Sequence, residues 1–382
     1  MKHFSFSIPQ NVFFGWGSLN DLTSIAGKTG ASKAFIVSGP HLRKAGYVDL
    51  CKEKLAQAGI SSDSFTETEG NPSTDTVEKA ASKFKESGAD LIVAFGGGSP
   101  LDVAKAVAVL GSYGGKITDY EGVGKVPGPV VPMIAIPTTA GTGSEVTSFS
   151  VITDHSRDYK LTVGSTYLLP SYVILDPELI TTVPLKTSAY CGVDALVHAL
   201  EAYLSLASSP FSDMMALQAL ELIGSNIRDY VADRKDRKAA EGMLLGSLFA
   251  GIAFSHARLG DVHAMSHPVS AYFDVAHGLA NAVLLPVVVE FNAQSDTGKY
   301  YEIYTRVAVD PVAKAEFRSE YLANELRFLN TSLGIPGSLK EVGVDSSKFD
   351  AMAEDAMKSG NIAVNPRKTT KEDILSLYHQ AF

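Results

Sequence analysis

Residues 91–105 read Leu91-Ile92-Val93-Ala94-Phe95-Gly96-Gly97-Gly98-Ser99-Pro100-Leu101-Asp102-Val103-Ala104-Lys105, an apolar run followed by three glycines. This order predicts a buried strand, a tight turn and a helix, with Ser99 as N-cap, Pro100 at the first helical position and Asp102 as a capping-box acid. Glycines let backbone N–H groups approach a ligand, and a helix N-terminus favours an anion, so a pyrophosphate would fit here. The stretch is neither Gly-x-Gly-x-x-Gly nor a Walker A motif, so a plain strand-to-helix turn is the alternative.

The sequence around this corner alternates between strand-like and helix-like segments. Phe4, Phe6 and Ile8 alternate with polar residues, and a helical segment ends near residue 56. Residues 74–87 have helical spacing, and further strands are expected at residues 33–37, 61–68, 130–136, 146–152 and 172–175. Strands that alternate with helices of about a dozen residues indicate an α/β fold with a parallel sheet covered on both faces.

After Pro184 the pattern becomes helical. Apolar residues recur every three or four positions in residues 187–205, 213–232, 237–257 and 370–382. Residues 283–289 are the one later stretch that suggests a strand, although Pro286 disfavours it as a central one. We therefore expect an α/β domain over residues 1–184 and an all-α domain over residues 185–382.

Composition limits the classes of function. The 382 residues carry 33 Lys+Arg against 42 Asp+Glu, a net charge of −9, which argues against a nucleic-acid or anionic-membrane surface. Two cysteines, Cys51 and Cys191, give no disulfide framework and no cysteine zinc site. The longest apolar run is too short to span a bilayer, and the first residues lack the apolar core of a signal peptide. We expect a soluble, cytoplasmic protein.

A second glycine-bearing loop follows another buried run. It reads Ile136-Pro137-Thr138-Thr139-Ala140-Gly141-Thr142-Gly143-Ser144-Glu145. Hydroxyl groups and glycines at the carboxyl end of a strand suit a nucleotide crevice in an open α/β sheet. Two such loops in one α/β half favour a dinucleotide site.

Histidines and aspartates cluster in the helical half. Five of the nine histidines lie between His198 and His277. Asp194 and His198 are four residues apart, hence on one face of a helix, and His263 and His267 repeat this spacing. Imidazole and carboxylate suit Fe²⁺, Zn²⁺ or Mn²⁺, although lone histidines are more often core residues. Spacing leaves open which of His263, His267 and His277 are ligands.

Together these motifs resemble those of the group III, iron-dependent alcohol dehydrogenases, and the resemblance covers essentially the whole chain. It is carried by both glycine-bearing loops and by residues 14–17 (Phe-Gly-Trp-Gly), 70–72 (Gly-Asn-Pro), 194–203 (Asp-Ala-Leu-Val-His-Ala-Leu-Glu-Ala-Tyr), 263–268 (His-Ala-Met-Ser-His-Pro) and 277–282 (His-Gly-Leu-Ala-Asn-Ala). The resemblance implies a dehydroquinate synthase-like fold, in which an N-terminal dinucleotide-binding domain and an all-α metal-binding domain enclose a cleft. Homodimers are usual in this family.

The resemblance also implies the roles of individual residues. One divalent metal, Fe²⁺ or Zn²⁺, would be bound by Asp194, His198, His263 and His277, with His267 as the catalytic residue beside nicotinamide and substrate. Residues expected around NAD or NADP are Gly39, Asn71, Gly97, Gly98, Ser99, Asp102, Thr138, Thr139, Thr142, Phe149, Val151 and Lys160.

The implied activity is that of a metal-dependent alcohol dehydrogenase or aldehyde reductase. The metal would polarise the C–O bond of a small aldehyde or primary alcohol, and hydride would pass between its carbon and the nicotinamide. His267, an ordered water or the cofactor ribose would transfer the proton.

Two positions depart from the family pattern. Many relatives carry an aspartate where this chain has Gly39, so a block against NADP is missing, and His41, Arg43 and Lys44 lie nearby. Arg258 replaces a residue that is usually small, and an arginine there suits a short aldehyde with an anionic tail, such as sulfoacetaldehyde. The alternatives are a plain turn at Gly39, with NAD still used, and an Arg258–Asp261 pair without a substrate role.

Three other functions are compatible with parts of this pattern. Glycerol dehydrogenases and dehydroquinate synthases share the fold, but the latter hold many Lys and Arg residues around a phosphorylated substrate, and the helical half shows no comparable cluster. A non-catalytic dinucleotide sensor would have a closed metal shell and no hydride transfer.

Overall fold

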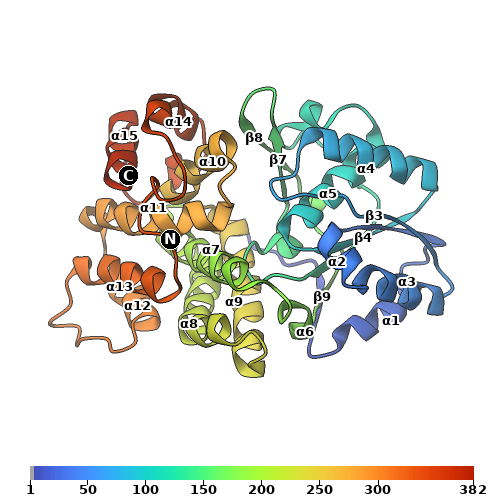
Figure 1. The fold of residues 1–382 in the computed structure, drawn as a ribbon, viewed down its shortest axis with the longest axis horizontal. Coiled ribbons are helices and arrows are strands. Elements are labelled where there is room, and N and C mark those ends of the chain that lie inside the picture. The colour runs from blue at the N-terminus through green and yellow to red at the C-terminus, as the bar shows by residue number, and fades with distance from the viewer. Residues whose placement is uncertain (1–3) are drawn as a thin grey trace. The chain divides into compact units, whose positions relative to one another are not determined.

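A computed structural model describes residues 4–382 of the chain (Figure 1). The first three residues, part of the start that is expected to lack the apolar core of a signal peptide, lie outside the described residues. Two compact units are present: an α/β unit of Ile8–Thr139 and Ser144–Thr182, and a helical unit that holds residues 4–7, 140–143 and 183–382. The main division of the chain falls between Thr182 and Val183, next to the expected residue 184.

The N-terminal segment differs from its expected structure. The alternation of Phe4, Phe6 and Ile8 predicts a strand, and this prediction is wrong, since residues 4–10 form neither helix nor strand. Phe6 instead stacks on Phe211 with ring centroids 4.9 Å apart. The alternating aromatic residues therefore pack on the helical unit, rather than in a sheet.

The core of the α/β unit is a six-stranded sheet in which all neighbouring strands run parallel. In spatial order its strands are β1 (Asn11–Phe14), β9 (Tyr172–Leu175), β6 (Met133–Pro137), β4 (Leu91–Gly96), β2 (Lys33–Val37) and β3 (Ser61–Phe65). The predicted parallel α/β sheet is confirmed, with strand ends that shift by a few residues.

Helices cover both faces of this sheet (Figure 1). Successive residues of a strand point to opposite faces, so Phe35 belongs to one core and Ile36 to the other. The first core contains side chains of α4 (Thr74–Ser87) and α5 (Gly98–Tyr113), and the second contains side chains of α1 (Leu22–Lys28) and α3 (Tyr47–Gln57). Both faces of the sheet are buried, as the continuous apolar strands predict.

The strand order changes direction beside β2. This strand pairs with β3 on one side and with β4 on the other. In open parallel sheets a ligand crevice forms at such a point, outside the carboxyl ends of the strands. Gly39, which precedes the short helix α2 (Pro40–Lys44), follows β2, and the glycine corner follows β4. The fold therefore places both expected cofactor segments at the switch point.

A three-stranded sheet completes the α/β unit. The hairpin of β7 (Phe149–Asp154) and β8 (Tyr159–Gly164) is antiparallel, and β5 (Gly122–Val123) lies beside β8. Sequence analysis predicts only the first strand of this hairpin, because its turn, residues 155–158, contains no glycine or asparagine. Asp158 takes a positive φ of 46° there instead.

The helical unit is built from helices that run to the end of the chain. The longer ones are α7 (Leu185–Leu204), α8 (Pro210–Ala232), α9 (Arg237–Ala257), α10 (Asp261–Phe273), α11 (His277–Asn292), α12 (Lys299–Val307), α13 (Ser319–Ser332), α14 (Phe349–Met357) and α15 (Lys371–Gln380). The strand considered at residues 283–289 is wrong, because this run lies inside α11, where burial on all sides removes the helical periodicity.

Among the residues that the structure describes, no single helix has the length and apolarity needed to cross a membrane, and one pair, α9 and α10, passes that test only together, across a bend of 104°.

Candidate metal centre and cofactor corner

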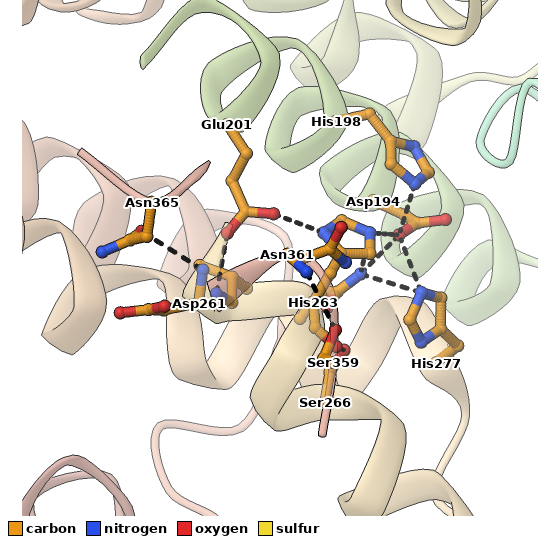
Figure 2. Close-up of polar contacts among 12 residues, drawn as sticks. Asp194, His198, Glu201, Asp261, His263, Ser266, His277, Ser359, Asn361 and Asn365 are labelled. Atoms are coloured by element: carbon orange, nitrogen blue, oxygen red, sulfur yellow. Dashed lines mark hydrogen bonds and ion pairs between the residues drawn. The ribbon is translucent and has the colours of Figure 1, made fainter. Parts of the chain in front are cut away.

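Four side chains of the helical unit bring one possible ligand atom each into a common cluster (Figure 2). The atoms come from Asp194, His198, His263 and His277, and they all lie within 4.8 Å of one another. Each histidine Nε2 is 3.8 Å from Asp194 Oδ1. The cluster thus contains two of the three downstream histidines between which spacing could not choose.

Three helices position these atoms. Asp194 and His198 lie one turn apart on α7, His263 lies in the first turn of α10, and His277 begins α11. The next residue, Gly278, allows α11 to start close to α7, since a Cβ atom there would lie 2.3 Å from a backbone oxygen of α7. The glycine of the His-Gly pair is therefore required by packing.

The donor set fits a divalent transition metal. One carboxylate oxygen and three imidazole nitrogens are ligands that Fe²⁺ and Zn²⁺ both accept. Two ligand atoms that each lie about 2.1 Å from one ion can be at most about 4.2 Å apart, and the 3.8 Å between each histidine Nε2 and Asp194 Oδ1 falls within this limit. Asp194, His198 and His263 are buried, whereas the side chain of His277 is 25% exposed. His277 is therefore the most exposed member of the cluster.

Burial favours the protonation state that binds metal. It lowers the pKa of His263 well below the usual value, and the neighbouring His198 lowers it further, whereas Asp194 raises it. A neutral imidazole has one nitrogen lone pair free for a cation, whereas an imidazolium has none. His263 is thus held in the ligating form.

Contacts to the other ring nitrogen fix the orientation of two imidazoles. His198 Nδ1 lies 3.2 Å from the carbonyl oxygen of Gly141, and His263 Nδ1 lies 2.6 Å from Glu201 Oε2. Both acceptors require a proton on Nδ1, which leaves Nε2 free to face Asp194. Sequence analysis does not single out Glu201, although its spacing from Asp194 and His198 places all three on one face of α7.

Asn281 is a further member of the cluster that sequence analysis does not identify. Its Nδ2 donates to Asp194 Oδ1 at 2.6 Å and lies 3.1 Å and 3.2 Å from Nε2 of His263 and His277. Asn281 follows His277 by one helical turn, which is the only sequence signal for this contact.

The glycine corner joins β4 to α5 in the α/β unit. Gly96 lies opposite Pro137 in the parallel pair of β4 and β6, and Thr138 N donates to Gly96 O at 2.9 Å. A Cβ atom on Gly97 would lie 3.3 Å from the side chain of Thr139. The two loops therefore lie side by side because they leave neighbouring parallel strands at the same edge.

The cap of α5 differs from the prediction. The helix begins at Gly98, with Gly97 as an N-cap that has no side-chain bond, so Ser99 as N-cap is wrong. Asp102 is not a capping-box acid either, since its carboxylate accepts from Ser144 Oγ at 2.6 Å and from Val151 N at 3.1 Å. The helix thus starts two residues earlier than predicted, which leaves its first N–H groups without a side-chain cap.

The remaining expected cofactor residues lie in several segments. Lys160 Nζ donates to Asn71 Oδ1 at 2.8 Å, and Phe149 and Val151 lie on β7. Gly39 is the N-cap of α2, where an added Cβ would lie 3.3 Å from a backbone oxygen. Thr142 belongs to residues 140–143, which pack with the helical unit rather than with the α/β unit that was expected to contain it.

Residues 140–143 pack closely against neighbouring segments. An added Cβ on Gly141 would lie 2.8 Å from Cys191, and one on Gly143 would lie 2.6 Å from the Cα of Gly251. The glycines of the second loop therefore allow backbone to pack against α7 and α9. The same packing brings the carbonyl oxygen of Gly141 to His198.

Comparison with known proteins agrees with this arrangement. The family model for iron-containing alcohol dehydrogenase matches residues 9–177, and that for the C-terminal region of the Fe-containing alcohol dehydrogenase family matches residues 188–382. The chain is 37% identical to a 1,3-propanediol dehydrogenase of Citrobacter freundii over 384 residues, which covers 100% of this chain and 99% of the relative. The chain belongs to the iron-containing alcohol dehydrogenase family.

Two solved structures extend the comparison. A crystal structure of 1,3-propanediol oxidoreductase matches with a TM-score of 0.95 and 36% identity, covering 100% of both chains. Sulfoacetaldehyde reductase from Bifidobacterium kashiwanohense, in complex with NAD⁺, matches with a TM-score of 0.88 and 27% identity over 100% of this chain and 99% of that one. As a family member, the chain is an oxidoreductase that acts on CH–OH groups with NAD(P) and a divalent metal.

In this dehydrogenase His267 lies beside the ligand cluster without joining it. Its ring centroid is 5.3 Å from that of His277 and 6.3 Å from that of His263. His267 and His263 are one turn apart on α10, which explains their proximity. The arrangement separates the histidine expected to be catalytic from those expected to bind metal.

Arg258 lies in the break between α9 and α10 of the dehydrogenase. Its φ of 63° and ψ of −175° fall in a region that is essentially restricted to glycine, and a side chain held there indicates strain. The alternative of an Arg258–Asp261 pair on one helix is wrong, because the helix breaks between them and Asp261 accepts from Thr369 Oγ1 at 2.6 Å. The guanidinium lies against Gly360, and a side chain there would collide with it.

Proposed function

We propose that this dehydrogenase holds one divalent cation, Fe²⁺ or Zn²⁺, through Asp194, His198, His263 and His277, and interconverts short aldehydes and primary alcohols. The observation that carries the proposal is the convergence of four ligand atoms within 4.8 Å on three different helices. Bound there, the cation would supply Lewis acidity toward the substrate oxygen, while the nicotinamide cofactor would supply or accept hydride.

The chain's own residues orient the ligands and move the proton. Gly141 and Glu201 hold the rings of His198 and His263. We assign proton transfer to His267, because it lies beside His277, whose side chain is the partly exposed one of the ligand set.

The cofactor proposal rests on the switch point of the α/β unit. The uncapped N-terminus of α5, at Gly97, Gly98 and Ser99, offers N–H groups to a pyrophosphate. Thr138 and Thr139 pack beside it, and the other expected contacts are those of Gly39, Asn71, Asp102, Thr142, Phe149, Val151 and Lys160. Gly39 leaves the segment after β2 without a carboxylate, so both NAD and NADP are compatible.

Arg258 supports a second, narrower candidate, an aldehyde with an anionic tail. The side chain is exposed, and no hydrogen bond or ion pair of its guanidinium is found among the residues that the structure describes. Retaining an arginine on strained backbone points to a function, and a planar guanidinium suits a carboxylate, sulfonate or phosphonate. A structural relative is a sulfoacetaldehyde reductase.

The narrower candidate is tested with two aldehydes of similar size. Sulfoacetaldehyde is expected to show a higher kcat/KM than propanal, and Arg258→Gly to raise KM at least tenfold for sulfoacetaldehyde alone. Glycine suits the backbone at this position, so the variant removes the guanidinium without adding strain. A clear preference for propanal in the wild-type enzyme contradicts the anionic candidate.

Assembly and location are part of the same proposal. Val12 and Phe14 of the edge strand β1 are exposed at the end of the parallel sheet, and a second copy of the chain would cover them in a homodimer. A cytoplasmic location is compatible with the cysteines, since neither Cys51 nor Cys191 forms a disulfide in the described part of the chain. Light scattering after gel filtration measures the assembly.

The general function is tested by following oxidation of NADH and NADPH with a panel of short aldehydes on protein of known metal content. Metal-dependent reduction of at least one aldehyde is expected. A silent panel, with metal and cofactor both shown to bind, would favour a dinucleotide sensor. Activity confined to glycerol, or to a phosphorylated cyclisation substrate, would favour the glycerol dehydrogenase-like or dehydroquinate synthase-like function.

A further inference from the structure

Glu201 is a buried carboxylate that contacts the start of α10. Its side chain is 5% exposed on α7, and its Oε2 lies 2.6 Å from His263 Nδ1 (Figure 2). Its Oε1 accepts from Val262 N at 2.7 Å. Among the described residues, no Lys or Arg forms an ion pair with this carboxylate. A carboxylate buried without a cationic partner is costly, so its retention requires a reason.

We propose that Glu201 is a positioning residue for the metal ligand His263. A neutral imidazole has one N–H and one lone pair, and a carboxylate can only accept. Glu201 therefore keeps the proton of His263 on Nδ1 and directs the Nε2 lone pair toward Asp194. The contact to the Glu201 carboxylate fixes the ring of His263 more strongly than the corresponding contact fixes the ring of His198, because His198 Nδ1 faces a neutral carbonyl oxygen at 3.2 Å. The inference rests on the proposed metal centre.

The break between α9 and α10 lies close against Glu201. A Cβ atom on Gly260 would lie 3.0 Å from Glu201 Oε1 and 2.9 Å from Asn365 Oδ1. That Asn365 oxygen also accepts from Asp261 N at 3.2 Å (Figure 2). Glu201 is thus enclosed by the backbone of the α9–α10 break on one side and held by His263 on the other.

The substitution Glu201→Gln distinguishes a residue that positions His263 from one that only fills space. A glutamine has one carbonyl oxygen and one NH₂ group where the glutamate has two acceptors. If the oxygen faces His263, the NH₂ group opposes the N–H of Val262. If the NH₂ group faces His263, the ring proton must move to Nε2, where it blocks metal binding. Either arrangement weakens metal affinity, and replacing such outer partners typically costs 10- to 100-fold.

The experiment titrates metal-stripped protein with Co²⁺ and follows the visible d–d absorption, with a competing chelator to set the scale. Wild type, Glu201→Gln, Glu201→Asp and the control Asp261→Asn are compared. Asp261→Asn makes the same carboxylate-to-amide change on the first residue of α10, but its side chain accepts from Thr369 Oγ1, and no hydrogen bond or ion pair joins it to a histidine among the described residues. About 10- to 100-fold weaker binding and an altered spectrum are expected for Glu201→Gln, with the control within twofold of wild type.

Two results would overturn the inference. One is a Glu201→Gln protein with the affinity and spectrum of the control. If Glu201→Gln does not fold, Glu201→Asp decides, because it keeps the charge but withdraws the carboxylate by one methylene: weaker binding supports the inference, and wild-type binding contradicts it. Failure of the wild type itself to bind Co²⁺ would instead contradict the proposed metal centre.

Discussion

Lys105 in the α/β unit and Asp194 in the helical unit are both buried charged residues, but their surroundings differ. Lys105 is 0% exposed, and its Nζ lies between 2.6 and 3.0 Å from five oxygens of Ser144, Thr147 and Phe149. Asp194 is 2% exposed, and its Oδ1 faces the Nε2 atoms of three histidines, which offer further lone pairs.

The difference separates a structural charge from a binding charge. The cation of Lys105 is satisfied by the protein itself, and it ties α5 to the segment that leads into β7. The acceptors around Asp194 converge on one point, where the described residues supply only a neutral amide, that of Asn281. A cation from outside the chain would satisfy these acceptors together. A buried charge indicates a ligand site where no charged partner from the protein faces it.

Asp194→Ala is expected to have the largest effect, because it removes the only anionic ligand. Metal content should fall from one ion per chain to near zero, and aldehyde reduction should be lost with it. Elemental analysis and NAD(P)H oxidation measure the two quantities. Asp229→Asn, an exposed change on α8, serves as the control and should keep both. An Asp194→Ala protein with full metal content would contradict the assignment.

Lys105→Met should chiefly lower stability. It leaves the surrounding oxygens and the half-buried Asp102 without their cation, which typically costs about 3–5 kcal/mol. Chemical denaturation measures the loss, and metal content per folded chain should be unchanged. Lys85→Met, an exposed lysine on α4, is the matched control. A loss of metal from folded Lys105→Met protein would remove the distinction between the two clusters.

His267→Ala should slow turnover while metal stays bound. General acid–base catalysis contributes about 10²–10⁴-fold, and an ordered water can replace part of it, so a loss of about 10²-fold in kcat is expected. His155→Ala, an exposed histidine between β7 and β8, should leave kcat unchanged. Loss of metal from His267→Ala would instead make His267 a ligand.

Glu145 should give the smallest effect, a pH dependence of stability. Burial raises the pKa of Glu145 to about 7, against a hydrogen bond from its own backbone and the attraction of Lys105. The folded form therefore binds more protons than the unfolded form between about pH 4.5 and 7, and stability falls as pH rises through that window.

Glu145→Gln should flatten this dependence by on the order of 1 kcal/mol per unit of pKa difference, as measured by Tm between pH 5 and 7. Lys105 and Asp102 face the same cluster and are unchanged in this variant. If the stability of the Glu145→Gln protein fell equally steeply with rising pH, another titratable group would be responsible for the pH dependence.

Sequence reasoning identifies structural features that are set by residues close together along the chain. Asp194 and His198 lie on one helical face because they are four residues apart, and the glycine corner follows a run whose apolar continuity marks a buried parallel strand. For His263, His267 and His277, spacing gave candidates, and the structure brings His263 and His277 to Asp194.

Partners that are distant in sequence were not predicted. Glu201 and His263 are 62 residues apart, and Gly141 and His198 are 57 apart, so no periodicity connects them. The predicted cap of α5 is wrong for a similar reason. Asp102 accepts hydrogen bonds from Ser144 and Val151, which lie in other segments, rather than from its own helix. Tertiary contacts overrode the local preference at each of these positions.

Metal removal and stepwise reconstitution test the central claim most directly. Protein stripped with a chelator is loaded with increasing Fe²⁺ or Zn²⁺, and NAD(P)H-dependent reduction of a short aldehyde is measured at each step. The account predicts no turnover in the stripped protein and recovery that is linear up to one ion per chain. Full turnover without metal, or recovery by the Asp194→Ala variant at the same stoichiometry, would contradict it.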